Sequence, residues 1–279
     1  MVQFPNCKIN IGLRVVRKRT DGFHDIESLF YPLPFVDALE IIGPGASAKP
    51  LSTRLHQTGF IATDNTSENF CLKAYHLLAG HHPGLPAVDI HLHKAIPMGA
   101  GLGGGSSDGA FALKMLNKIL GLGLSDQQLR AYALNLGSDC PFFIRNQPCI
   151  ARGRGDEMEA LKFDLKAYKI IIINPGIHIN TRWAFQQVTP SVPDQPMREI
   201  IEKPMEQWRQ TLVNDFEIPV FAAYPEIKVI KEELYKTGAR YASMSGSGST
   251  VYGIFDKTEK PVIRFPSHYF IKELSGELQ

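Results

Sequence analysis

The glycine-rich segment Pro97 to Ser107, PMGAGLGGGSS, constrains the fold of this chain more than any other stretch of its sequence. Five of the seven residues from 99 to 105 are glycines, so the backbone there can take positive φ angles and approach a ligand closely. An apolar stripe at helical spacing follows at once, made of Ala112, Met115, Leu116 and Ile119. We therefore expect a loop that leads into a helix, which begins near Ser106 or Ser107 and ends at Gly121.

The exposed backbone amides of such a loop, together with the unpaired N–H groups of the helix start, form a binding site for a polyphosphate. The alternative is a flexible linker, but a linker is seldom followed directly by an amphipathic helix. Gly99-x-Gly101-x-x-Gly104 matches the dinucleotide fingerprint, yet no second buried strand that ends in an acidic residue follows the helix. A Walker A loop would end in Gly-Lys-Ser/Thr, and no such lysine is present.

The composition is that of an ordinary folded protein of one large or two modest domains, with 279 residues, 44% apolar and 21% charged. The net charge of +2 predicts no general binding to nucleic acid or to an anionic membrane. The four cysteines share no C-x-x-C spacing, so the sequence indicates neither a zinc site nor a disulfide framework. The longest aliphatic run, 170–173, is too short to span a bilayer, and no secretory signal is visible. We expect a cytoplasmic protein of a reducing compartment.

Three more helices follow from apolar spacing and end signals. One carries Phe70, Ala74, Leu77 and Leu78 and ends at Gly80. The next opens with the capping box Ser125-x-x-Gln128 and stops at Gly137, and the last runs from Pro225 to Gly238. Strands are predicted at 87–93, 149–152, 168–174, 240–244 and 250–255, whereas 43–66 is predicted to be irregular. Because these elements do not alternate as regular βαβ units, the fold class is α+β.

The first predicted strand, Cys7 to Val16, places Lys8 and Asn10 on one face. From the residues alone, this polar pair fits a solvated face and a functional site equally well. The turn Asp21-Gly22 follows and presents Phe23 and His24.

These motifs together resemble those of the GHMP kinases, the superfamily of galacto-, homoserine, mevalonate and phosphomevalonate kinases. Their nucleotide loop has the form P-x-x-x-G-L-G-S/G-S-S, which Pro97 to Ser107 fits. Two further signatures occur in the expected order, namely Lys8 in CKINIGL and the Ser/Gly loop Met244 to Thr250 before a strand.

The segments at 8–10, 21–24, 137–143 and 174–176 resemble one branch of this superfamily. Its members phosphorylate the C2 hydroxyl of a cytidine-diphosphate-linked methylerythritol in the non-mevalonate isoprenoid pathway. Many of them carry Tyr at the position of Phe23 and a smaller aliphatic residue at that of Cys140, and neither change removes a group that the chemistry needs. The resemblance covers nearly the whole chain.

The resemblance implies a two-domain fold of class α+β. Residues 1–155 would form the ATP-binding domain, of the ribosomal-protein-S5-domain-2 type, and residues 156–279 a ferredoxin-like α/β-plait domain, with the active site in the cleft between them. It also implies a monomer or weak homodimer that acts on a small molecule, without nucleic-acid or membrane partners.

The resemblance also implies residue roles. Asp139 would be the catalytic base, and Lys8 would keep Asp139 ionised and hold the acceptor hydroxyl. ATP, delivered with Mg²⁺ whose protein ligands the sequence does not identify, would lie along Pro97, Met98, Gly99, Ala100, Gly101, Leu102, Gly103, Gly104, Gly105, Ser106 and Ser107.

Family correspondence suggests Asn69 and Lys94 for the adenine end of ATP, although these fit a capping asparagine and a solvated lysine equally well. The acceptor would be held by Asn10, Phe23, His24, Thr181 and Phe185. Without the resemblance, both phenylalanines could equally be core residues.

Three other functions compete with this interpretation. A homoserine or mevalonate kinase would not need the aromatic residues Phe23, His24 and Phe185. A nucleotide-dependent oxidoreductase would use the glycine fingerprint for a dinucleotide. An inactive binding protein is disfavoured because Lys8 and Asp139 are both present.

Overall fold

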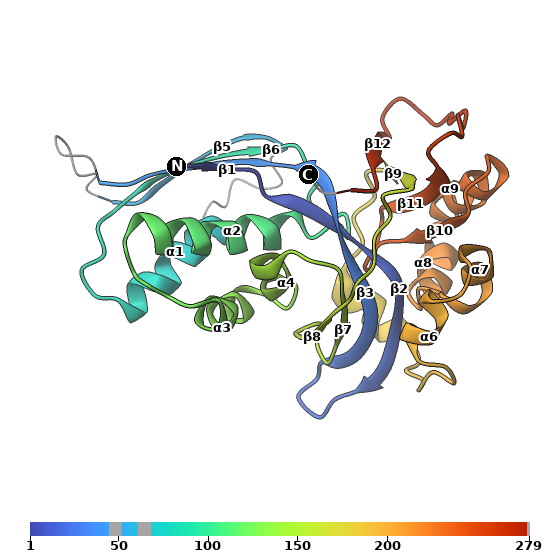
Figure 1. The fold of residues 1–279 in the computed structure, drawn as a ribbon, viewed down its shortest axis with the longest axis horizontal. Helices are drawn as coiled ribbons and strands as arrows, with labels where there is room; N and C mark the ends of the chain where they lie inside the picture. The colour runs from blue at the N-terminus through green and yellow to red at the C-terminus, as the bar shows by residue number, and fades with distance from the viewer. Residues whose placement is uncertain (45–51, 61–67, 278–279) are drawn as a thin grey trace. The chain divides into compact units, whose positions relative to one another are not determined.

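The computed structural model describes residues 1–44, 52–60 and 68–277, which cluster into two compact units that interleave along the chain (Figure 1). Unit 1 consists of Met1–Cys7, Phe35–Met98 and Gly103–Asn146. Unit 2 consists of Lys8–Pro34, Gly99–Leu102 and Gln147–Gln279. The glycine-rich segment is thus shared between the units. The predicted domain boundary between residues 155 and 156 stays a prediction, because the clustering follows packing and not chain order.

Unit 1 contains a four-stranded sheet and four helices that lie along one face of it (Figure 1). The sheet has the order β1-β4-β6-β5, and only the pair of β5 with β6 is parallel. Its strands are β1 (Val2–Gln3), β4 (Ala38–Ile42), β5 (Arg54–Gly59) and β6 (Asp89–Lys94). Its helices are α1 (Phe70–His81), α2 (Gly104–Ile119), α3 (Asp126–Leu136) and α4 (Cys140–Arg145).

Local sequence signals set the ends of these helices. The capping box predicted for α3 is present, because Gln128 N donates to Ser125 Oγ at 3.3 Å and Ser125 N donates to Gln128 Oε1 at 2.9 Å. Helix α2 begins at Gly104, before the predicted Ser106, because Gly103 takes a left-handed φ of +69° as its N-cap. The predictions for α1 and α3 are confirmed to within one residue of their ends.

Unit 2 is built on two antiparallel sheets. The first has the order β2-β3-β7-β8 and the second the order β10-β11-β9-β12. The strands of the first sheet are β2 (Asn6–Lys18), β3 (His24–Val36), β7 (Cys149–Arg152) and β8 (Glu157–Ala160). Those of the second are β9 (Tyr168–Asn174), β10 (Tyr241–Met244), β11 (Val251–Asp256) and β12 (Phe270–Ser275).

The helices of unit 2 pack on the second sheet and on one another (Figure 1). They are α5 (Thr181–Gln187), α6 (Met197–Ile201), α7 (Trp208–Thr211), α8 (Glu217–Ala223) and α9 (Pro225–Lys236), with a 3₁₀ turn at Met205–Gln207. Ile227, Ile230 and Leu234 of α9 are fully buried in the core beside β11, as their spacing predicted. Within the described ranges, no helix is both long and apolar enough to cross a membrane.

Two expectations were wrong. The predicted irregular segment 43–66 contains β5, which pairs in parallel with β6; its residues 45–51 and 61–66 lie outside the described residues. The solvated alternative for the polar face of β2 is also wrong, because Lys8 and Asn10 are only 2% and 1% exposed. Neighbouring segments cover both faces of this strand, so alternation along it does not separate core from solvent.

Replacing Ser125 with Ala should lower the free energy of unfolding by about 1 kcal/mol, because α3 loses its capping hydroxyl. Urea denaturation measures this loss, and turnover should not change. The matched control is Gln127→Ala at an exposed neighbouring position, which should have almost no effect. Equal stability of the two variants would show that the cap contributes nothing.

Candidate active site

Three motifs predicted from the sequence meet within unit 2. They are the start of β2, the first half of the glycine-rich segment and the Ser/Gly loop that follows β10. Lys8 N donates to Leu102 O at 2.9 Å, which joins β2 to the glycine-rich segment. Ser245 Oγ donates to Gly101 O at 2.8 Å, and Thr250 N donates to Ala100 O at 3.2 Å. Residues 99–102 therefore lie between two other predicted motifs.

The contact between these two loops requires a glycine at position 101. Gly101 has a φ of +79°, and a Cβ atom there would lie 2.0 Å from the carbonyl oxygen of Ser245. No side chain fits this space, because real Cβ atoms do not approach a backbone oxygen so closely. The glycine content of this half of the segment is therefore explained by packing as well as by any ligand.

Lys8 is a buried cation whose side chain is held in one direction. Its Nζ donates to Asn10 Oδ1 at 2.6 Å and lies 4.4 Å from the centre of the Phe30 ring. Asn10 is itself fixed, because its Nδ2 donates to Ser28 Oγ at 2.9 Å and its backbone N donates to Ser245 Oγ at 3.2 Å. The structure thus brings the two predicted residues Lys8 and Asn10 into direct contact.

The second half of the glycine-rich segment lies in unit 1, where it forms the first turn of α2. The N–H groups of this turn and the positive end of the helix dipole lie at Gly103–Ser106, which suits an anion. Ser107 is fully buried, and its hydroxyl makes no hydrogen bond with a described residue. Of the two residues that precede the glycines, Met98 is 44% exposed and Pro97 is buried.

Asp139, also in unit 1, is the N-cap residue of α4 and is half-buried. It directly precedes Cys140, the first residue of α4, and α4 packs against α2. Asp139 and the first turn of α2 therefore belong to the same group of packed helices in unit 1. Burial raises the pKa of the Cys140 thiol to about 12, so this cysteine is not a nucleophile at neutral pH.

Lys94 is buried, so the alternative of a solvated lysine is wrong. Its ammonium, 2% exposed, bonds to the carboxylate of Asp37 and to Asp108 Oδ2 at 2.6 Å. Asp37 Oδ1 also accepts from the backbone N of Ala95 and Ile96. Burial opposes the charge on Lys94, but the two carboxylates outweigh it and raise the pKa of this lysine. The cluster connects β6 to the second turn of α2.

Within this cluster, burial destabilises the charged form of Asp108. Burial raises the pKa of its carboxyl to about 8, although the charge of Lys94 acts in the opposite direction. Its Oδ1 is buried and makes no hydrogen bond with a described residue. Burial therefore disfavours the charged form of Asp108 inside the cluster with Lys94 and Asp37.

Asn69 caps α1, which was one of the two alternatives left open for it. Its Oδ1 accepts from Cys71 N at 2.8 Å, and its Nδ2 donates to Gln57 Oε1 at 3.0 Å. A contact of Asn69 with adenine stays a prediction.

The residues predicted to hold the acceptor all belong to unit 2, and two of them, His24 and Phe185, are in contact. The ring of His24 stacks on that of Phe185 with centroids 4.8 Å apart and an interplanar angle of 16°. Phe185 also packs edge-on against buried Phe216 at 4.8 Å, so this residue contacts the core, and its contact with the acceptor stays a prediction. Phe23 is 48% exposed, and Thr181 Oγ1 lies 2.9 Å from Ser247 Oγ of the Ser/Gly loop.

Three positioning residues were missed by the sequence analysis. Asp37 and Asp108 hold Lys94, and buried Asn214 donates to Met244 O at 2.7 Å and to Gly246 O at 2.9 Å. Asp108 directly follows the Ser-Ser pair of the glycine-rich motif, and that position was a usable signal. Asp37 and Asn214 lie in stretches without periodicity, where no sequence signal marks them.

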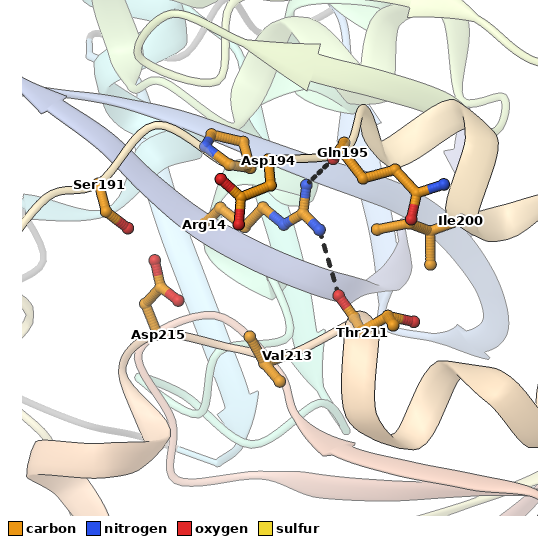
Figure 2. Close-up of a pocket in the computed structure, with 9 residues that line it drawn as sticks. Arg14, Ser191, Asp194, Gln195, Ile200, Thr211, Val213 and Asp215 are labelled. Atoms are coloured by element: carbon orange, nitrogen blue, oxygen red, sulfur yellow. Dashed lines mark hydrogen bonds between the residues drawn. The ribbon is translucent and has the colours of Figure 1, made fainter.

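A cavity of about 320 Å³ in unit 2 was also missed (Figure 2). Arg14 of β2 lies at its edge and donates to Gln195 O at 2.7 Å and to Thr211 O at 3.1 Å. Asp215 faces the cavity as well, and burial raises the pKa of its carboxyl. The lining residues all come from outside the predicted site. The hydrogen bonds of Arg14 join β2 to the segment before α6 and to the end of α7.

Family models match both halves of the chain. The model described as GHMP kinases N terminal domain matches residues 69–147, and the one described as GHMP kinases C terminal matches residues 197–266.

Relatives match almost the full chain. A 4-diphosphocytidyl-2-C-methyl-D-erythritol kinase of Azobacteroides pseudotrichonymphae is 47% identical over 97% of this chain and 100% of the relative. One of Bacteroides thetaiotaomicron is 49% identical over 92% of each chain.

Solved structures agree with the fold. A crystal structure of 4-(cytidine 5'-diphospho)-2C-methyl-D-erythritol kinase has a TM-score of 0.76 at 29% identity and covers 99% of this chain and 100% of that one. Homoserine kinase from Cytophaga hutchinsonii has a TM-score of 0.64 at 14% identity, with 99% and 96% covered, and shares the fold. The two-domain fold of class α+β expected from the sequence is confirmed.

Replacing Gly101 with Ala should cost clearly more stability than the same change at Gly121. Both glycines have positive φ, which costs an alanine about 1–2 kcal/mol, but Gly121 has open space around it and Gly101 meets the Ser245 carbonyl. The two free energies of unfolding are compared by urea denaturation. Gly101→Ala should also weaken ATP binding in calorimetry. Identical losses for the two variants would contradict the close contact.

Replacing Asp108 with Asn should change how stability depends on pH. The folded chain keeps this proton up to about pH 8, whereas an unfolded aspartate loses it near 3.8. The folded state therefore binds more protons in this range, so this group's contribution to stability falls as the pH rises from about 4 to about 8. An asparagine at position 108 does not titrate, so the Asp108→Asn variant does not lose stability in this way. As the pH rises through this range, its free energy of unfolding should increase relative to that of the wild type by up to about 1.4 kcal/mol per pH unit.

Denaturation midpoints of both proteins at pH 5, 7 and 9 test this prediction. Asp126→Asn, at an exposed position of the same unit, is the control and should run parallel to the wild type. A constant difference between Asp108→Asn and the wild type at all three pH values would place the pKa of Asp108 below this range.

Proposed function

Because the chain belongs to the GHMP kinase family, we propose that it phosphorylates the C2 hydroxyl of 4-diphosphocytidyl-2-C-methyl-D-erythritol with ATP, giving the 2-phosphate and ADP. Relatives of this name match the chain over almost its whole length. The observation that carries the choice of acceptor is the stacked pair of His24 and Phe185 beside half-exposed Phe23. A cytosine ring offers a flat face for such rings, which homoserine and mevalonate lack.

The phosphates of ATP are assigned to the glycine-rich segment. Glycines 99, 101 and 103–105 have no side chain that would keep a phosphate from the backbone, and the first turn of α2 adds the positive end of the helix dipole. Asn69 and Lys94 are assigned to the adenine end, Asn69 by its place at the start of α1. The ammonium of Lys94 is already bound by Asp37 and Asp108, so its effect on the nucleotide passes through α2.

In the transfer step, Asp139 takes the proton of the acceptor C2 hydroxyl. The oxygen then attacks the γ-phosphorus, and the bond from that phosphorus to the β,γ-bridging oxygen breaks to release ADP. Lys8 supplies positive charge that offsets the negative charge that builds up on the transferring group. Asn10 orients Lys8, which explains why the two side chains are in contact.

We assign Mg²⁺ to ATP as its counterion, where it would neutralise phosphate charge. Among residues 1–44, 52–60 and 68–277, no group of three or more His, Cys, Asp or Glu could hold a metal ion. We name no protein ligand for it and derive no step from it. A cytoplasmic location and a monomeric or weakly dimeric state belong to the same proposal.

A coupled assay of ADP release tests the function directly. ADP should appear only when ATP and the cytidine-diphosphate-linked methylerythritol are both present, and homoserine or mevalonate should not replace the acceptor. Thermal unfolding gives an independent measurement, since ATP and not NADH should protect the chain. Release of ADP with homoserine or mevalonate alone would contradict the proposed acceptor, and protection by NADH would favour an oxidoreductase.

Asp139→Asn should lower turnover by about 100- to 10,000-fold, because a positioned base contributes on this order. The affinity for ATP should stay within a few-fold, since the amide keeps the size of the carboxyl. Asp126→Asn, an exposed aspartate of the same unit, is the matched control. If Asp139→Asn kept a tenth of the wild-type turnover, Asp139 would not be the base.

A further inference from the structure

Arg154 lies in the turn between β7 and β8, and backbone hydrogen bonds fix that turn beside the start of β3. Gly155 N donates to Arg152 O at 3.0 Å, which closes the turn. Ile26 N, in β3, donates to Gly153 O at 2.8 Å. The position of Arg154 relative to the β2–β3 hairpin is therefore set by the backbone.

The guanidinium of Arg154 covers one face of the Phe23 ring. Its Cζ lies 3.8 Å from the ring centroid, which is a close cation–π contact. Its Nε is buried and makes no hydrogen bond with a described residue. The hydrogen-bonding capacity of this guanidinium is therefore not used up by the described residues.

The neighbouring arginines, unlike Arg154, have carboxylate partners among the described residues. Their guanidinium groups form ion pairs within the same two hairpins: Arg17 with Asp25, Arg19 with Asp21, and Arg152 with Glu27. Across the described ranges, Arg154 has no ion pair. The nearby carboxylate of Asp21 already accepts from Phe23 N and from Arg19 Nε. The hydrogen bond from Phe23 N lowers the pKa of Asp21 most, and the charges of Arg19 and Arg154 add to this effect.

A nucleoside diphosphate matches this group of residues. Its base can stack on exposed aromatic rings, and its diphosphate is an anion joined to the base through one ribose. A guanidinium is planar and presents paired N–H donors that fit two phosphate oxygens at once. Phe23 is 48% exposed, so a base can lie against the ring that Arg154 covers from its other face.

We propose that Arg154 is a specificity-determining residue that binds the diphosphate of the nucleotide-linked acceptor while its guanidinium plane supports the Phe23 ring. This inference rests on the proposed function, because it takes the acceptor to be a cytidine diphosphate derivative. It adds a charged contact to a site that the aromatic residues alone would make selective only for the base.

Calorimetry with cytidine and with cytidine diphosphate as probes separates the two contacts. Wild-type protein should bind the diphosphate about ten- to a hundredfold more tightly than the nucleoside, as expected for charged hydrogen bonds. Arg154→Met keeps an apolar chain over Phe23 and removes the charge. It should lose most of this preference, whereas its affinity for cytidine should stay within about threefold.

The matched control is Arg17→Met, which removes the same charge from the neighbouring β2–β3 hairpin at a side chain that is 70% exposed. It should keep the preference for the diphosphate, and all three proteins should unfold at similar temperatures. In the ADP-release assay, Arg154→Met should raise the KM of the acceptor about tenfold or more and leave the KM of ATP unchanged.

Each further outcome has a distinct meaning. If Arg154→Met weakens both probes equally, Arg154 only supports Phe23 and the diphosphate contact is wrong. If the variant keeps the wild-type preference, the inference is overturned. If wild-type protein binds ATP but neither cytidine probe, the proposed acceptor itself is wrong, and the assignment of Arg154 is rejected with it.

Discussion

The contact between residues Gly101 and Ser245 brings two glycine-rich backbones together, and the candidate site of unit 2 depends on it. Ser245 Oγ donates to Gly101 O and accepts from Asn10 N, so one hydroxyl joins both loops to β2. Because β2 also carries Lys8, the position of the predicted catalytic lysine is tied to the packing of these loops. Any side chain at position 101 would separate them. The requirement for glycine here comes from the protein as much as from a nucleotide.

Lys94 and Lys8 are both buried, but their surroundings differ. Lys94 lies between two carboxylates, Asp37 and Asp108, and the charge of its ammonium is balanced inside unit 1. Lys8 is held by the amide oxygen of Asn10 and by the ring of Phe30. The first arrangement anchors β6 to the second turn of α2. The second points a cation in a set direction, which suits a step in which negative charge develops.

The aromatic residues that are predicted to contact the acceptor are held in place by packing within the protein. Phe185 is half-buried because one side of it packs on Phe216 in the core, while His24 stacks on it. Such a ring is pre-positioned at little cost in conformational entropy when a base binds. Phe23 is held differently, by the guanidinium of Arg154 on one face. The surface that would receive the acceptor is therefore set by packing on one side and by a cation on the other.

Local sequence signals were sufficient wherever a single segment determines its own structure. The capping box at Ser125, the apolar stripe of α9 and the glycine-rich turn before α2 each depend on contacts between near neighbours, so they could be predicted from residue spacing. The grouping of motifs into a kinase of the GHMP type was also available from the sequence, because each motif keeps its own residue pattern.

Contacts between distant segments could not be predicted in this way. Strand β5 contains few apolar residues and exists because it pairs with β6, and Lys94 is buried because Asp37 and Asp108 come from elsewhere in the chain. Arg154 reaches Phe23 only because β7 pairs with β3. A side chain's spacing shows which local structure it favours, but the partner that neutralises its charge or covers its face is set by the tertiary fold, where electrostatics and packing act between residues far apart in sequence.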